Sequence, residues 1–326
     1  MIVLDKTSVE KLLPMDICIA GMREAMWQMG LGATVQPLRT VLAIPDQPKF
    51  MGVMPGYIPI EDLAIGAKVI SVFPDNIKHG KPSHQGLVIL FHAGTGEVAA
   101  LVNAEAITAI RTAATTAVAT DVAARQDASR LLLLGYGTQA IQHARALPLV
   151  RNFETITICG RDKKKARLCA DQIATEFAGQ VCVADSIETA AQSADVICAL
   201  THARLPILQG SWLRRGVHIN AVGSSTRGFR EIDEQVVLRS RFFGDYEAGI
   251  RAQSEEFLYA LENGQVSAEH LLGDLGQVLT GQLTIRRDND DITCFKSLGN
   301  VVQDLYASAL AVERAGQQGC GMQIDC

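Results

Sequence analysis

The sequence predicts an α/β protein in which a doubly wound parallel sheet is combined with a second domain of α+β structure. Between residues 130 and 221, short apolar segments of strand type alternate with helical segments, which indicates parallel strands joined by crossover helices. Between residues 35 and 102, short apolar runs are instead separated by Pro and Gly turns, which favours a mostly antiparallel sheet. The length of 326 residues is sufficient for about two domains.

The composition is that of a globular enzyme. Hydrophobic residues make up 48% and charged residues 20% of the chain, which excludes a disordered protein. A formal net charge of -5 gives no reason to expect nucleic acid or an anionic membrane as a partner. The sequence has neither a secretory signal pattern nor an apolar run of about 18 residues, so we expect a cytoplasmic protein.

The cysteines and histidines give no indication of disulfides or of a metal site. None of the eight cysteines forms a C-x-x-C pair, and we expect them to be reduced in a cytosolic protein. Of these, Cys320 and Cys326 lie in a Gly-rich tail. The histidines lack the spacing of metal ligands, so no metal is expected.

The predicted N-terminal domain begins with a helix. Pro14 can start it, because the first turn does not need the missing N–H, and Gly30 can end it. Methionines and Cys18 recur between them at helical spacing, which indicates a face turned to the core rather than a methionine-based site. The antiparallel sheet of residues 35–102 follows, and then an Ala- and Thr-rich helix over 107–124.

A polar break at residues 126–129 marks the expected domain boundary. The segment 130–134 is a strand of buried type, and further strands and helices alternate as far as the sequence GVHINAVG. The segment 295–312 is expected to return to helix, with apolar residues on one face. These residues are Phe295, Leu298, Val302, Leu305 and Ala309.

The glycine loop after the first of these strands predicts a dinucleotide site. The run Gly135-Tyr136-Gly137-Thr138-Gln139-Ala140 fits G-x-G-x-x-A, and it follows a strand and opens a helix, which gives this common pattern its meaning. Gly135 would permit the tight turn, and Gly137 would let the backbone approach a pyrophosphate at the helix N-terminus. The parallel domain is therefore expected to be a Rossmann domain.

The end of the second strand indicates which cofactor is preferred. An NAD site commonly has an acid there for the ribose hydroxyls, whereas this chain has Gly160, Arg161 and, one position late, Asp162. Arg161 is placed to face an adenosine 2′-phosphate, and Asp162 can still contact the ribose. We therefore expect NADPH, with NADH as the alternative. A solvated helix face is the other interpretation of this basic segment, and it accounts for Lys164 and Lys165.

Several separate runs, in order along the chain, resemble the ornithine cyclodeaminase/μ-crystallin family. These runs are Lys81–Gly86 (KPSHQG), Ala106–Ala114 (AITAIRTAA), the glycine loop with Gln139, His218–Ser225 (HINAVGSS) and Phe295–Gly299 (FKSLG). The resemblance covers about residues 39–304. It implies a homodimer, a substrate and dimerisation domain formed by residues 1–125 plus 300–326, and an inserted Rossmann domain at 126–299.

The resemblance also implies that three cations hold a substrate carboxylate, and by motif these are Arg39, Lys68 and Arg111. The chemistry agrees, because Arg offers a bidentate fork to a carboxylate and Lys adds a point charge. Arg111 lies in an apolar, Ala-rich stretch, where an unpaired charge would be costly. An internal salt bridge is the alternative role for Arg111.

The cofactor site that follows from the glycine loop and the resemblance is extensive. Small hydroxyl and amide side chains in it can bind phosphate or carboxamide without blocking them, and Lys296 would lie near the nicotinamide end. The expected cofactor-binding residues are Ser83, Arg111, Thr112, Gly135, Gly137, Thr138, Gln139, Gly160, Arg161, Asp162, Thr201, Val222, Gly223, Ser225, Lys296 and Ser297.

One position departs from the cyclodeaminases of the family. They carry an acid in the loop after the INAVG-like strand, where this chain has Ser225, and the Pro-Gly-Lys that follows is replaced by Arg227-Gly228-Phe229. Without that acid, the steps that oxidise an amine and release ammonia are disfavoured. The last half-reaction, the reduction of a cyclic imine, depends on the acid least. The serine resembles the ketimine-reductase branch, which includes μ-crystallin and Δ1-pyrroline-2-carboxylate reductases.

The expected function is therefore NAD(P)H-dependent reduction of a small cyclic imino acid, Δ1-pyrroline-2-carboxylate to L-proline, with Δ1-piperideine-2-carboxylate to L-pipecolate as a second activity. Ser83, His84 or a bound water would protonate the imine, and Lys68 is the third expected catalytic residue. His84 has an alternative role in holding its loop. The alternatives are a linear amino-acid (alanine-type) dehydrogenase, an ornithine cyclodeaminase, and a non-catalytic protein that binds NADPH and a small ligand.

Overall fold

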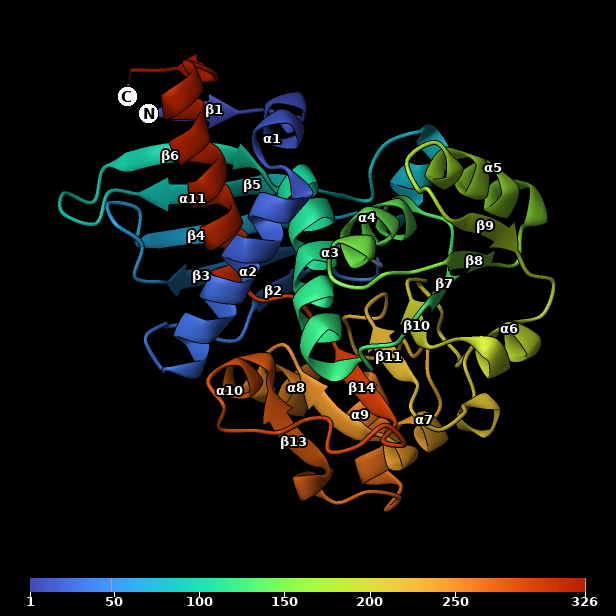
Figure 1. Ribbon diagram of the computed structural model, residues 1–326. Helices are drawn as coiled ribbons and strands as arrows, with labels where there is room; N and C mark the ends of the chain where they lie inside the picture. Colours follow the sequence, from blue (N-terminus) through green and yellow to red (C-terminus); the bar gives the residue numbers. More distant parts are fainter. Residues whose placement is uncertain (48, 326) are drawn as a thin grey trace. The chain divides into compact units, whose positions relative to one another are not determined.

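A computed structural model describes residues 1–47 and 49–325 of the chain (Figure 1). It divides into two compact units, unit 1 with Met1–Arg111 and Asn300–Cys326, and unit 2 with Thr112–Gly299. Every cysteine among the described residues is free, and Cys326 lies outside them. None of the helices in the described ranges combines the length and the apolar character that crossing a membrane requires.

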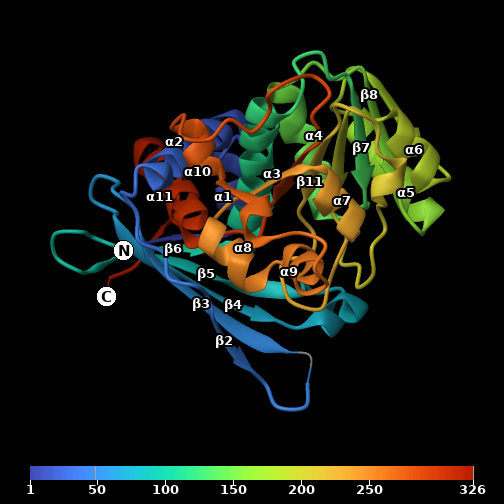
Figure 2. The same ribbon diagram turned by 90° about the horizontal axis from the view of Figure 1, so that it is seen from below.

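Unit 1 is built on a sheet with the strand order β15-β1-β6-β5-β4-β3-β2. Consecutive strands from β2 to β6 pair antiparallel, which confirms the antiparallel sheet predicted for residues 35–102. The edge strand β2 is seen in Figure 2. The strands are β1 (Ile2–Leu4), β2 (Thr40–Ala43), β3 (Phe50–Tyr57), β4 (Ile65–Val72), β5 (His84–Phe91), β6 (Val98–Asn103) and β15 (Met322–Gln323).

Two long helices, α2 (Met15–Gly30) and α11 (Val301–Gln318), cover one face of this sheet (Figures 1 and 2). Pro14 is the N-cap of α2 and Gly30 its last residue, which confirms the predicted helix. The helix α11 approaches the strands closely, because a Cβ on Gly66 of β4 would lie 2.5 Å from Leu305 Cδ2. Shorter elements of unit 1 are α1 (Lys6–Leu12) and the 3-10 helix η1 (Pro74–His79).

The boundary between the two units falls inside a helix. The predicted Ala- and Thr-rich helix is present as α3 (Ala104–Ala123), and its residues up to Arg111 belong to unit 1 by their contacts. The sequence places the boundary at 125/126, just beyond this helix, because a polar break is visible there and a division within a continuous helix is not. The second junction lies at 299/300.

Unit 2 contains a sheet in the order β13-β12-β14-β11-β10-β7-β8-β9, and each neighbouring pair is parallel. The chain adds β8 and β9 on one side of β7 and then continues with β10 on the other, so the predicted doubly wound fold is confirmed. The strands are β7 (Arg130–Leu134), β8 (Thr155–Cys159), β9 (Gln180–Val183), β10 (Val196–Ala199), β11 (His218–Ala221), β12 (Arg241–Gly244), β13 (Leu271–Asp274) and β14 (Thr293–Lys296).

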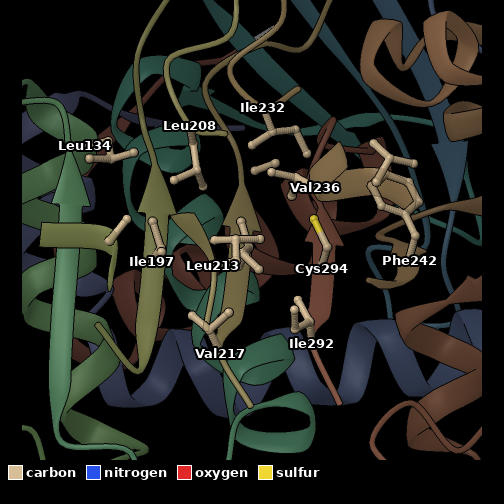
Figure 3. Close-up of a cluster of buried hydrophobic side chains, with 14 of the residues drawn as sticks. Leu134, Ile197, Leu208, Leu213, Val217, Ile232, Val236, Phe242, Ile292 and Cys294 are labelled. Atoms are coloured by element: carbon tan, nitrogen blue, oxygen red, sulfur yellow. The ribbon is translucent and has the colours of Figure 1, made fainter. Parts of the chain in front are cut away.

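The core of unit 2 is formed by apolar side chains of these strands and of the helices beside them. Figure 3 shows Ile197 of β10, Cys294 of β14 and Phe242 of β12 in one buried cluster. The helices are α4 (Thr138–Ala146), α5 (Lys163–Ala174), α6 (Ile187–Ser193), α7 (Glu234–Arg239), α8 (Glu247–Gln253), α9 (Glu255–Glu262) and α10 (Leu275–Leu279), with the 3-10 turns η2 (Leu147–Leu149), η3 (Gly210–Trp212) and η4 (Ala268–His270).

The helix predicted over 295–312 is wrong at its start. Phe295 lies in β14, which pairs with β11 and β12, so its burial comes from a central strand and not from a helix face. The chain turns at Gly299, where φ is +76°, and α11 starts only after Asn300, whose side chain accepts a hydrogen bond from Gln303 N. The apolar residues that suggested one helix therefore belong to two elements, the strand β14 and the helix α11.

Candidate cofactor and substrate sites

The glycine loop joins the carboxyl end of the interior strand β7 to α4, at the position in the sheet where the strand order reverses. Gly135 has a φ of +125°, and a Cβ there would lie 3.0 Å from the carbonyl oxygen of Leu200, so the turn requires glycine. A Cβ on Gly137 would meet no atom within 4 Å. Gly137 is the N-cap of α4 and supplies no side-chain hydrogen bond, so no capping side chain competes with an anion for the N–H groups at the start of this helix.

The neighbouring β8 ends in the residues expected at the adenosine ribose. Arg161 is exposed, while Asp162 is the N-cap of α5 and accepts hydrogen bonds from Lys164 N at 3.0 Å and Lys165 N at 3.2 Å. The side chains of Lys164 and Lys165 are exposed, as a solvated helix face requires. Gly160 is needed for packing, because a Cβ there would lie 2.5 Å from the ring of Tyr136.

A buried carboxyl group, Glu231, connects the ends of β10 and β11. Thr201 donates both its backbone N–H and its hydroxyl to Oε1, the latter at 2.7 Å, and Gly223 N donates to Oε2 at 2.6 Å. Burial raises the pKa of Glu231 to about 7, although Lys296 and the two hydrogen bonds from Thr201 oppose the shift. Glu231 therefore fixes the two loops that carry Thr201, Val222 and Gly223.

Glu231 was not predicted from the sequence. In Arg230-Glu231-Ile232-Asp233 it looks like a residue of a charged loop, and only the fold encloses it, with 0% of its surface exposed. Gly223 is the local sign of this crowding, because a Cβ on it would lie 2.0 Å from Thr201 O and 2.8 Å from Glu231 Oε1.

Lys296, at the end of β14, is enclosed and forms an ion pair. Its Nζ lies 3.0 Å from Glu256 Oε1 and also donates to the carbonyl oxygen of Ser224, and neither charged side chain is exposed. In the structure the ammonium of Lys296 contacts Glu256 and the loop after β11, and its expected contact with the cofactor stays a prediction. Ser297 is buried beside it, and Ser225 is half-buried.

In unit 1, two of the three predicted cations meet at one carboxylate oxygen. Lys68 of β4 places Nζ 3.1 Å from Asp304 Oδ1 and 2.6 Å from Thr108 Oγ1. Arg111 of α3 places Nε 2.9 Å from the same Oδ1, and its Nη1 donates to Gln303 Oε1 at 2.7 Å. The internal salt bridge that was the alternative role for Arg111 is therefore present, and Asp304 links Arg111 to Lys68 through it.

The electrostatics of this cluster affect Lys68 most. Burial lowers the pKa of Lys68 to about 8; the nearby Asp304 raises it, and Arg111 and Arg39 lower it. The half-buried Arg39 is thus electrostatically coupled to Lys68. Lys68 and Arg111 are 3% and 4% exposed and Asp304 is fully enclosed. Asp304 was not predicted, since between Gln303 and Leu305 nothing in the sequence distinguishes it from a surface acid.

Ser83 and His84 form a contact of their own at the start of β5, where Ser83 Oγ lies 3.0 Å from His84 Nδ1 and His84 is exposed. Of the expected cofactor residues on α3, Thr112 is buried. No group of three or more His, Cys, Asp or Glu side chains within the described ranges is placed to hold a metal ion.

The model of the ornithine cyclodeaminase/mu-crystallin family matches residues 1–319. The ketimine reductase mu-crystallin of Mus musculus is 33% identical over 282 residues, which cover 86% of each chain.

Two solved structures are similar over almost the whole chain. The Δ1-pyrroline-2-carboxylate reductase of Thermococcus litoralis, in complex with NADH and L-proline, has a TM-score of 0.96 and 30% identity, covering 99% of this chain and 100% of its own. An archaeal alanine dehydrogenase dimer with bound NAD has a TM-score of 0.93 and 26% identity, covering 100% of this chain and 99% of its own.

Proposed function

Because the chain belongs to the ornithine cyclodeaminase/mu-crystallin family, we propose that it reduces Δ1-pyrroline-2-carboxylate to L-proline, with NADPH as the reductant. The chain is an oxidoreductase that uses a nicotinamide dinucleotide and acts on C=N or CH–NH bonds. Δ1-Piperideine-2-carboxylate, reduced to L-pipecolate, is the proposed second substrate. The mu-crystallin relative is a ketimine reductase, and the Thermococcus litoralis enzyme holds L-proline.

The observation that carries this proposal is the buried cluster of Lys68, Arg111 and Asp304. Lys68, Arg111 and Asp304 together carry one net positive charge in an enclosed place, and Arg39 also lowers the pKa of Lys68. Burying such a charge is costly unless a counter-ion arrives. A monocarboxylate substrate supplies that counter-ion. Lys68 has two acceptors among the described residues, and an ammonium has a third N–H for the substrate.

The residues of unit 2 fit a dinucleotide. We propose that the first turn of α4, open at Gly137, binds the pyrophosphate and that Arg161 binds an adenosine 2′-phosphate. Thr201, Val222 and Gly223, held by Glu231, and the neighbouring Ser225 and Ser297 would border the nicotinamide end. The hydride is the chemistry that the bound nicotinamide supplies.

The chain must also place a proton on the imine nitrogen, because a protonated imine is the better hydride acceptor. Lys68 is one candidate, since a pKa of about 8 keeps its ammonium charged near neutral pH and lets it give up a proton readily. The contact of Ser83 Oγ with His84 Nδ1 provides the other candidate donor. Lys68, Ser83 and His84 are therefore the proposed catalytic residues.

A second candidate function is the reductive amination of a linear 2-oxo acid. The similarity to the archaeal alanine dehydrogenase favours it, because the same cation cluster would hold pyruvate. Steady-state oxidation of NADPH with Δ1-pyrroline-2-carboxylate, and separately with pyruvate plus ammonium, tests both functions. Turnover of the cyclic imine alone supports the proposal, and turnover of pyruvate alone contradicts it. Binding of NADPH without turnover of either would indicate a non-catalytic binding protein.

We further propose a homodimer formed through the exposed face of the unit 1 sheet. Side chains alternate along its strands, so Tyr57, Ile65 and Leu87 point away from the face that carries Lys68, and all three are exposed. An apolar surface of this kind marks an association site, and the archaeal alanine dehydrogenase is a dimer. Sedimentation velocity should give the mass of two chains for the wild type and of one for Ile65→Asp. A monomeric wild type would contradict the proposal.

A further inference from the structure

We infer that Asp304 is a positioning residue of the substrate site, which directs Lys68 and Arg111 toward the substrate carboxylate and preserves the charge that attracts it. This inference rests on the proposed function of these two cations. No substrate contact is assigned to Asp304 itself. It acts through a single oxygen, Oδ1, which both cations share.

The geometry gives each cation a fixed orientation. Lys68 Nζ is held between Asp304 Oδ1 and Thr108 Oγ1, and the guanidinium of Arg111 is held between the same Oδ1 and Gln303 Oε1. Long cationic side chains otherwise sample many rotamers, and fixing them beforehand reduces the entropy lost when a ligand binds. Asp304 thus acts on both cations at once, from the first turn of α11.

The burial of Asp304 suits this role better than a purely structural one. Its side chain is fully enclosed, and its Oδ2 has no hydrogen-bond partner among the described residues. A buried acid that served only the fold would be expected to have both oxygens paired, because an unpaired buried acceptor is costly. The position of Asp304 in the first helical turn stabilises its negative charge through the helix dipole.

Asp304 also affects the charge state of Lys68. The groups that act on the Lys68 ammonium are Asp304, which raises its pKa, and Arg111 and Arg39, which lower it below the value set by burial. Without the carboxylate, the two arginines act unopposed and the pKa of Lys68 falls further. Lys68 would then lose its proton at a lower pH, and with it part of the attraction for a carboxylate.

The experiment compares Asp304→Asn with the wild type in complete pH profiles, from pH 6 to 9. It measures kcat/KM for Δ1-pyrroline-2-carboxylate and, by calorimetry, the affinity of the NADP⁺-bound protein for L-proline. In the wild type, both should decline above a pH of about 8, as Lys68 deprotonates. In Asp304→Asn that decline should begin at least one pH unit lower. The KM for the imine should rise by about 10-fold or more at pH 8, and by a smaller factor at pH 6.

The matched control is Glu313→Gln, which removes an exposed acid from the same helix and should leave both profiles unchanged. A lower melting temperature of Asp304→Asn with an unshifted profile would overturn the inference, since that is what a structural role produces. Proline affinity keeps the test independent of the proposed reaction. If wild-type protein binds L-proline but does not reduce the imine, the proposed function fails while the profile in proline binding still decides the role of Asp304.

A second variant covers the case in which Asp304→Asn does not fold. Asp304→Glu keeps the charge but moves the carboxylate by one methylene. The position of the basic decline should then stay as in the wild type, while KM for the imine and the dissociation constant for proline rise by about 10-fold, because the cations are directed differently. Wild-type KM together with wild-type proline affinity in this variant would refute the positioning role.

Discussion

Arg111 Nε lies 2.9 Å from Asp304 Oδ1, and the two side chains are 5% and 0% exposed. This ion pair joins the proposed substrate cation to a buried acid, so a substitution that removes the charge of Arg111 acts on stability and on binding together. Asp304 keeps Lys68 as a second partner when Arg111 is lost. The two effects must therefore be separated by the choice of variant.

Arg111→Lys provides that separation. The charge beside Asp304 is kept, so the melting temperature should stay close to that of the wild type. Lysine cannot contact Asp304 and Gln303 in the bidentate manner of a guanidinium, so kcat/KM for the imine should fall by about 10-fold or more.

Arg111→Met, which also removes the charge, should lower kcat/KM by ~100-fold or more, given ~2–5 kcal/mol for a broken buried charge pair, and should lower the melting temperature as well. A variant that melts lower but turns over normally would remove Arg111 from the active site.

Arg161→Asp tests the cofactor preference. The exposed guanidinium at the end of β8 is proposed to bind the 2′-phosphate, and a charge-assisted contact of this kind contributes ~1.5–3 kcal/mol. The KM for NADPH should rise on the order of 10-fold or more, whereas the KM for NADH should change little or fall. Arg167→Asp, also exposed and on α5, is the control. Unaltered NADPH kinetics in Arg161→Asp would show that Arg161 is only a surface residue.

Glu231 gives the protein a defined pH dependence of stability. Its pKa of about 7 lies above the ordinary value of 4.5, so the folded protein binds this proton more tightly than the unfolded chain does. The stabilisation is fully present below pH 4.5 and is lost as the pH rises through 7. Glu231→Gln cannot titrate, so its free energy of unfolding should improve relative to the wild type by about 2–3 kcal/mol between pH 5 and pH 8.

Urea denaturation of both proteins at the two pH values measures this difference. The exposed Glu188 provides the control, because Glu188→Gln should differ from the wild type by the same amount at pH 5 and pH 8. A difference for Glu231→Gln that does not change with pH would mean that Glu231 is ionised throughout this range, as an ordinary surface carboxyl is.

The parts of the fold that could be predicted are those whose signals are local. The glycine loop at Gly135 is one, because its strand, turn and helix are contiguous in the sequence and a positive φ needs glycine there. Lys68 and Arg111 were predicted from a family resemblance, but their common partner Asp304 was not, because it lies far away in the chain. Glu231 and Glu256 were also not predicted, because the presence of an acidic residue in a sequence does not indicate whether the fold buries it.

Periodicity failed where two elements follow each other closely. Phe295 belongs to β14, and the apolar residues from Val302 onward belong to α11, yet together their spacing imitates one helix. The strands β12 and β13 were not identified, because each is only four residues long and gains its partners from distant segments. Local sequence cannot indicate such pairings.

We propose that this chain reduces a cyclic ketimine acid and does not deaminate ornithine, because Ser225 stands at the position where the resemblance places an acid in the cyclodeaminases. The most direct measurement incubates one preparation with NADPH and Δ1-pyrroline-2-carboxylate, and in parallel with NAD⁺ and L-ornithine. NADPH oxidation and L-proline formation are followed in the first reaction, and ammonia and L-proline in the second. We predict stoichiometric L-proline from the imine and no ammonia from L-ornithine. Ammonia and L-proline from L-ornithine at a comparable rate would contradict the account.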